Sequence, residues 1–258
     1  MLAKCFTIPK PRMGFFFTNR PGFYDAQSNR FLNVFQGQGV QDCDLDVVEG
    51  SVSFRSDFGS RSRECIRLDD TTRFQFRNPI PYEGTMIAIA KVDMLGGGAT
   101  SRSIFPIICA DNANPNLAPS WNFSYFSGAV TMRHNCTTSG VGAALGSFSH
   151  GPEQEFLFAS AFDQTRRENA YILNEGSVTQ GTTSLTTTSG NAMAFGGRQK
   201  AKFGDMNNDA AVSDPAMADY VDIAALLFYG GNAVRDAEAD VNALYAEADK
   251  FYGLRYGS

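Results

Sequence analysis

The feature that most limits the fold of this chain is its series of short strand-like runs, which are separated by turn residues and not by helices. Residues 51–55 and 73–77 alternate polar and apolar side chains, as half-buried strands do. Residues 85–92 form a more continuous apolar run, which predicts a buried strand. Many short strands without alternating helices favour an all-β protein, an antiparallel two-sheet jelly-roll sandwich, over an α/β fold.

Two pairs of runs have the spacing of hairpins. Residues 121–126 and 129–133 are separated by Ser127-Gly128, a typical tight turn. Residues 155–161 and 169–173 flank a short charged segment. Each pair predicts two neighbouring antiparallel strands.

In the C-terminal segment the apolar residues repeat with the period of a helix and not with that of a strand. From Val234 to Phe251 apolar residues recur at the spacing of one buried helix face, acidic residues crowd the first turns, and Lys250 lies in the last turn. Gly253 is placed to end the helix in a left-handed conformation. The pattern predicts a structural α-helix over 234–252 that packs onto the sandwich.

The N-terminal segment lacks any sustained period. Residues 1–30 are rich in Pro, Gly, Asn and aromatic residues, which predicts an irregular arm ahead of a sandwich domain at 31–258. The arm carries apolar anchors that lie either on its own domain or on a neighbour. If it does not fold back on the domain, its aromatic side chains form an exposed apolar patch of a kind that soluble monomers avoid. We therefore expect the arm to mediate contacts with a sister copy or a capsid protein. The partner-binding candidates are Phe15, Phe16, Phe17, Phe23 and Tyr24.

Charge and hydropathy exclude several classes of function. The 258 residues carry a formal net charge of -5, which argues against electrostatic binding of nucleic acid or anionic lipid. Charges and prolines interrupt the N-terminus before an apolar run of secretory length can form, and no run is long enough for a membrane span. The five scattered cysteines predict free thiols and folding in a reducing cytoplasm.

The order of the later segments resembles the concanavalin A-like, laminin-G-like jelly-roll domain. That family has a "tyD…lYvNG" hairpin, an "iGg" strand, an "i.evliYd" strand and a short C-terminal helix in this order. Here the same order is found over roughly residues 50–256 in FLFASAFD (156–163), AYILNEG (170–176), AFGGR (194–198), DIAALLFY (222–229) and the helix. Asn174-Glu175-Gly176 departs from the family's Asn-Gly and predicts a three-residue turn.

The resemblance implies a class of function. Members are mostly binding and adhesion modules, and a minority are polysaccharide hydrolases or lyases. A stand-alone copy without a signal peptide is similar to the modules of phage decoration proteins, head fibres and tail spikes. We therefore expect a non-enzymatic structural or adhesion module of a virion, with capsid or tail proteins, sister copies and surface glycans as partners. The alternatives are a polysaccharide-active enzyme and a soluble lectin-like protein.

The sequence offers no catalytic residues. The nearest match to the Glu-x-Asp-x-x-Glu strand of laminarinase-type relatives is Glu153-Gln154-Glu155, which continues into apolar residues without a third acid and predicts a solvated strand entrance. Residues 63–67 echo the Arg-x-Glu-x-Arg strand of alginate lyases, but the Gln-x-His strand of those enzymes is absent. The two histidines, His134 and His150, leave few candidates for acid–base chemistry.

The best candidate for a sugar platform is Trp121, next to a Pro- and Asn-rich segment, with Tyr125 on the same predicted strand. Asp205, Asn207 and Asp209 place oxygen ligands at alternate positions, as the start of a calcium loop does. The loop departs from the EF-hand pattern at its sixth and twelfth positions. No cofactor is expected, with calcium at this cluster as the alternative.

Overall fold

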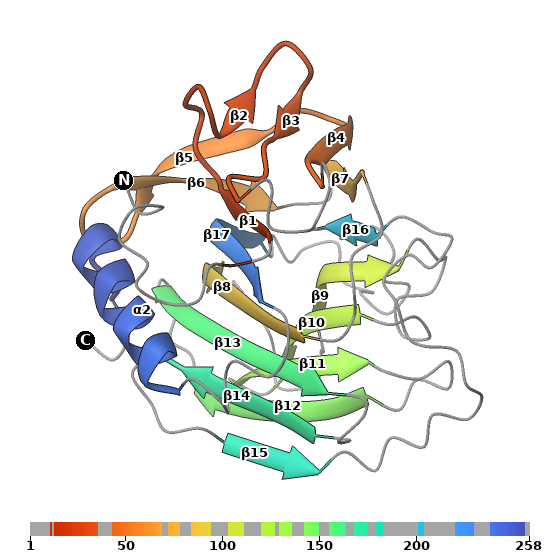
Figure 1. Cartoon of the computed structure of the whole chain (residues 1–258), viewed down its shortest axis with the longest axis vertical. Helices are drawn as coiled ribbons and strands as arrows, with labels where there is room; N and C mark the ends of the chain where they lie inside the picture. Colours follow the sequence, from red (N-terminus) through yellow and green to blue (C-terminus); the bar gives the residue numbers. More distant parts are fainter. Residues whose placement is uncertain are drawn as a thin grey trace.

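The described part of the chain consists of two antiparallel β-sheets and a C-terminal helix in the computed structural model (Figure 1). The predicted all-β sandwich is therefore confirmed. The structure describes residues 11, 13–35, 43–68, 72–77, 84–93, 103–110, 120–126, 129–135, 142–149, 155–163, 168–174, 179–182, 201–203, 220–229 and 238–255.

The first sheet has eight strands, and its central strands carry many of the buried apolar residues of the described structure. Its strands follow the spatial order β15 (Thr179–Thr182), β14 (Glu168–Leu173), β13 (Glu155–Asp163), β8 (Gly84–Asp93), β17 (Tyr220–Tyr229), β6 (Arg63–Leu68) and β5 (Ser53–Phe58). An additional strand, β1 (Met13–Phe16), pairs with β17 on the side away from β8. The predicted pairing of residues 155–161 with 169–173 is confirmed as β13 and β14.

The second sheet has nine strands. They follow the order β12 (Gly142–Ser149), β11 (Ala129–Asn135), β10 (Ser120–Phe126), β9 (Ser103–Ala110), β16 (Ala201–Phe203), β7 (Arg73–Phe76), β4 (Leu45–Glu49), β3 (Arg30–Phe31) and β2 (Tyr24–Asp25). Phe126 is paired with Ala129, which confirms the predicted two-residue hairpin between β10 and β11. β6 and β7 follow each other in the chain but belong to different sheets.

Helix α2 (Glu238–Tyr252) confirms the predicted C-terminal helix over its described length. Its buried face consists of Val241, Leu244, Ala248 and Tyr252, which pack with apolar residues of β8, β13 and β17. Gly253 ends the helix at a φ of 67°, the left-handed conformation that the sequence predicted. Among the described residues, no helix combines the length and the hydropathy that a membrane span requires.

The first sheet is the middle of three layers, so it is buried on both faces. On one face it meets α2. On the other it meets the second sheet through aromatic contacts, with the ring of Phe76 on β7 6.1 Å from Phe228 on β17 and 5.8 Å from Phe15 on β1. This double burial explains why β17 is an almost unbroken apolar run. Cys43 and Cys65 are buried thiols outside any disulfide, as predicted for the thiols that the structure describes.

The N-terminal aromatic residues lie inside the protein, which corrects their predicted role. Phe15 and Phe17 are 0% exposed and Phe16 is 6% exposed, because β1 is inserted beside β17 and its alternating side chains enter both interlayer spaces. The ring of Phe17 lies 5.0 Å from Phe31 in the intersheet core, whereas Phe16 joins the cluster beneath α2. The three side chains are core residues and are not accessible to a partner.

The end of α2 is fixed to the turn between β5 and β6 through backbone hydrogen bonds. Ser60 N donates to Gly253 O at 2.8 Å, and Arg61 N donates to Tyr252 O at 3.1 Å. Gly59, at a φ of 68°, makes this approach sterically feasible, since a Cβ there would lie 2.0 Å from Tyr252 O. The contact therefore requires glycine for its conformation and for its lack of a side chain.

This geometry predicts that Gly59→Ala disrupts the docking of the helix end. We expect the free energy of unfolding to fall by more than about 3 kcal/mol, because left-handed strain of about 1 kcal/mol adds to a clash with backbone atoms. Gly22→Ala is the matched control, since Gly22 also has a positive φ of 89° but no heavy atom of the described structure lies within 4 Å of its Cβ position. Urea unfolding of both variants measures the difference, and equal losses would contradict the close contact.

Candidate functional site

A pocket of about 110 Å³ opens where two strands share one edge of β17. β6 pairs with Val221–Ile223, and β1 pairs with the segment from Ala225 to Phe228, so the strands follow one another along that edge. The register of β17 against β8 shifts between Ile223 and Ala225, and the intervening Ala224 accepts a hydrogen bond from Phe17 N at 3.0 Å. The pocket is lined by Phe16, Phe17, Thr18, Arg20, Phe23, Arg63, Glu64, Ala224, Phe251 and Tyr252.

Aromatic rings form much of the pocket wall. Phe23 packs edge-on against Phe16, with ring centroids 6.0 Å apart, and Phe251 packs edge-on against Tyr252 at 4.9 Å. Phe16 and Tyr252 are buried, whereas Phe23 and Phe251 are half-buried and leave part of their surface to the pocket. Burial raises the pKa of the Tyr252 hydroxyl far above its ordinary value, so this group is neutral at physiological pH.

The polar side of the pocket is organised around the carboxylate of Glu64. Its Oε2 accepts a hydrogen bond from the Thr18 hydroxyl and lies 3.3 Å from Nε of Arg20. The Arg20 side chain is 69% exposed, so this ion pair lies at the rim of the pocket and contributes little to stability. The contacts of Glu64 nevertheless bring three polar side chains together at the pocket. Thr18 and Arg20 come from one segment of the chain and Glu64 comes from another.

A second guanidinium, that of Arg63, is held against the end of α2. Its Nε donates to Phe251 O at 3.0 Å, and its central carbon lies 4.4 Å from the centroid of the Phe251 ring. This is a cation–π contact that fixes the plane of the guanidinium. No carboxylate in the described part of the chain lies within ion-pair distance of Arg63. The pocket therefore offers hydrogen-bond donors and acceptors next to flat apolar surface.

Glu155 is an internal anchor instead of the solvated strand entrance that the sequence predicted. It is 0% exposed at the start of β13. Its Oε1 accepts a hydrogen bond from Gly59 N at 3.2 Å, and its Oε2 accepts from Nε of Arg255 at 2.9 Å. Nη2 of Arg255 also donates to Oε1. The carboxylate thus joins β13, the β5–β6 turn and the chain beyond α2, and it lies outside the pocket lining.

We predict that Glu155→Gln lowers the free energy of unfolding by about 3 kcal/mol, because it removes the charge that faces Arg255 and weakens the hydrogen bonds that the backbone amides of Gly59 and Arg255 donate to the side chain. Arg20→Gln, which breaks an exposed ion pair, is expected to change stability by less than about 1 kcal/mol. Chemical denaturation of the two variants provides the measurement. A Glu155→Gln protein as stable as wild type would show that the anchor is dispensable.

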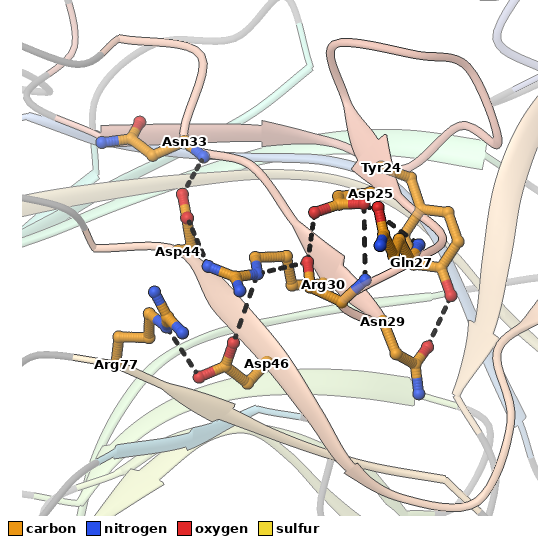
Figure 2. Close-up of polar contacts among 10 residues, drawn as sticks. Tyr24, Asp25, Gln27, Asn29, Arg30, Asn33, Asp44, Asp46 and Arg77 are labelled. Carbon is orange, nitrogen blue, oxygen red and sulfur yellow. Dashed lines mark hydrogen bonds and ion pairs between the residues drawn. The ribbon is translucent and has the colours of Figure 1, made fainter.

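A second group of charged residues lies where β3, β4 and β7 meet, and Figure 2 shows that these residues pair with one another. Arg30 Nη1 lies 3.7 Å from Asp44 Oδ2, and Arg30 Nε lies 4.0 Å from Asp46 Oδ1. Arg77 Nε lies 3.0 Å from Asp46 Oδ2. These internal contacts fix strand β3 to its neighbours, so the group is structural.

The hairpin of β2 and β3 is closed by local polar contacts, also drawn in Figure 2. Asp25 accepts hydrogen bonds from the backbone amide of Gln27 and from the hydroxyl of Ser28. These bonds lower the pKa of Asp25, with that from Ser28 the largest cause. The hydroxyl of Tyr24 donates to Asn29 Oδ1 at 2.5 Å, and Asn29 has a φ of 52° that suits the turn.

The structure separates the residues that the sequence singled out. Of the five predicted partner-binding aromatics, Phe16, Phe17 and Phe23 line the pocket, and Tyr24 packs its ring 4.9 Å from Phe31 and 5.2 Å from Phe54. Trp121 and Tyr125 lie on β10, as predicted, but their side chains are outside the described part of the structure. Their role in sugar binding stays a prediction.

The calcium candidates Asp205, Asn207 and Asp209 also lie outside the described residues, so calcium binding stays a prediction. Within the described residues, no group of three or more His, Cys, Asp or Glu side chains is placed to hold a metal ion.

Sequence reasoning missed most of the pocket. Thr18 and Arg20 carried no motif, Phe251 was noticed only as part of the helical pattern, and Arg63 and Glu64 were noticed only as part of a lyase-like strand pattern. The signal that could have pointed to Arg63 and Glu64 is the pair of charged residues at the start of β6, ahead of its apolar Cys65-Ile66. The charged pair points to a site only in the folded protein, where the end of α2 and residues 16–23 line the same pocket as Arg63 and Glu64.

Comparisons with known proteins show the fold. No family model and no curated protein sequence matches the chain. The binding domain of botulinum neurotoxin serotype D is similar in structure, with a TM-score of 0.61 and 9% identity over 92% of this chain and 52% of that one. Botulinum neurotoxin type C, whose cell entry depends on interaction with two ganglioside molecules, gives a TM-score of 0.59 and 12% identity over 92% and 51% of the chains.

A third similar structure has nearly the length of the chain itself. Domain 4 of AbnA, an extracellular arabinanase from Geobacillus stearothermophilus in complex with arabinotriose, gives a TM-score of 0.51 and 10% identity over 92% of this chain and 98% of that one. The chain spans about half the length of the neurotoxin binding domains that it matches. At these identities the likeness establishes a two-sheet β-sandwich of the kind found in these binding domains.

Proposed function

We propose that this protein is a non-enzymatic glycan-binding module and that its pocket between β1, β6, β17 and α2 holds a sugar unit. The observation that carries the proposal is the composition of the lining. A sugar presents hydroxyl groups at its edge and C–H groups on its faces, so its binding site needs hydrogen-bonding side chains beside apolar rings. The hydrogen-bonding side chains of this pocket are Arg20, Arg63 and Glu64. Its apolar rings are those of Phe23 and Phe251.

The similar structures support a glycan as the class of ligand. The neurotoxin of type C depends on gangliosides for cell entry, and the arabinanase domain was solved with arabinotriose. Both share the sandwich fold of this chain. The fold alone assigns no function, so the proposal depends on the pocket and takes from these proteins only the chemical class of ligand.

A binding role, and not hydrolysis, is supported by the carboxylates. Hydrolysis of a glycosidic bond generally requires two carboxyl groups about 5–9.5 Å apart. The pocket lining contains one, Glu64, and its Oε2 is already engaged by Thr18 and Arg20. A place in a phage particle, with capsid or tail proteins as partners, rests on the sequence resemblance and stays a prediction.

The experiment is a glycan array followed by titration of the strongest ligand. We predict that Phe23→Ala weakens binding by about tenfold, since a stacked ring contributes roughly 1–1.5 kcal/mol. Trp121→Ala is the matched comparison, because it removes the aromatic side chain that the sequence favoured. Melting temperatures of both variants show whether any loss of binding reflects unfolding.

The outcomes separate the candidate functions. Loss of binding in the Phe23→Ala variant alone supports the pocket, and loss in the Trp121→Ala variant alone places the sugar site on β10. Absence of any bound glycan contradicts the proposal. Release of new reducing ends or unsaturated uronates during incubation with polysaccharides would instead identify an enzyme.

A further inference from the structure

We infer that the sugar held in this pocket is an acidic one, with its carboxylate paired to Arg63. The inference rests on the proposed function and adds the chemical class of the ligand. Two sources of such a group, a uronic acid and a sialic-type acid, share the chemistry that the pocket recognises.

The charges of the lining do not cancel. Arg20 and Arg63 contribute two positive charges, and Glu64 contributes one negative charge. The negative charge is matched by Arg20, at 3.3 Å, and is further stabilised by the Thr18 hydroxyl. Arg63 is left without a carboxylate partner in the described structure. The pocket is thus locally positive in a chain whose formal net charge is -5.

Arg63 is also held in place before any ligand arrives. Its Nε donates a hydrogen bond to Phe251 O. Its planar guanidinium lies over the Phe251 ring, with 4.4 Å between the central carbon and the ring centroid. The hydrogen bond at Nε leaves the two Nη groups to bind a ligand. Two parallel N–H donors in a rigid plane match the two oxygens of a carboxylate, and a side chain that is already ordered loses little entropy on binding.

The size of the pocket limits how much of a ligand it encloses. Its volume of about 110 Å³ is below the roughly 300–1,000 Å³ of sites that enclose a drug-sized molecule. The pocket therefore holds one end of a saccharide, the carboxylate and the adjoining edge of the ring, while the rest of the molecule lies outside. The half-buried Phe23 and Phe251 are placed to contact that ring edge.

The test compares sugars that differ only in the acidic group. Galacturonic acid is titrated against galactose, and glucuronic acid against glucose, with N-acetylneuraminic acid as the second source of a carboxylate. We expect each uronic acid to bind about tenfold more tightly than its neutral partner, because hydrogen bonds to a charged group contribute roughly 1.5–3 kcal/mol. The preference should decline with added salt, since the interaction is electrostatic.

Variants of Arg63 assign the preference to this side chain. Arg63→Gln should abolish the difference between acidic and neutral sugars, and Arg63→Lys should restore only part of it, because lysine keeps the charge but lacks the planar pair of donors. Arg61→Gln is the matched control, since Arg61 is exposed, lies two residues away and is not part of the lining. Melting temperatures check that loss of the Arg63–Phe251 contact has not unfolded the helix end.

Equal binding of acidic and neutral sugars, abolished by Phe23→Ala, would overturn the acidic class and leave the proposed glycan function intact. An acidic preference that persists in the Arg63→Gln variant would overturn the role of Arg63. If no sugar of either kind binds, the proposed function fails, and this inference fails with it.

Discussion

The pairing of β1 with β17 is the interaction on which the rest of this structure depends. β17 lies in the middle layer, so both of its faces are buried, and its edge away from β8 would expose unpaired backbone groups if β1 were absent along Ala225–Phe228. β1 satisfies that edge and places Phe15 and Phe16 in opposite interlayer spaces. One short strand therefore completes a sheet and fills two cores at once.

This arrangement explains which parts of the fold the sequence could predict. Alternation of polar and apolar residues predicted strands such as residues 51–55 and 73–77, the hairpin spacing predicted β10 with β11, and the helical period predicted α2. Alternation arises only when one face of a strand meets water. β1 has no such face, and its four residues are too few for a pattern, so the Phe15-Phe16-Phe17 run was interpreted as part of an irregular arm that binds a partner.

The pocket was beyond sequence prediction for a different reason. Its lining comes from four segments that are far apart in the chain: residues 16–23, residues 63–64, Ala224 and residues 251–252. They meet because β1 and β6 share an edge, because β17 shifts register between Ile223 and Ala225, and because α2 ends against the β5–β6 turn. None of these three features leaves a periodic signal, and each depends on backbone geometry that only the assembled layers determine.

The end of α2 joins the stability of the protein to its proposed function. Phe251 and Tyr252 form one wall of the pocket, and the same two residues offer the carbonyl groups that receive Arg63 and the β5–β6 turn. The side chain of Arg63 therefore has two roles. Its Nε binds the end of the helix, and its two Nη groups remain as donors for the pocket. Since the groups that build the wall also hold it in place, a ligand that pairs with Arg63 binds only the docked form of the helix end. Such a ligand stabilises the folded protein by mass action, because the residues that line the pocket are also the residues that dock the helix end.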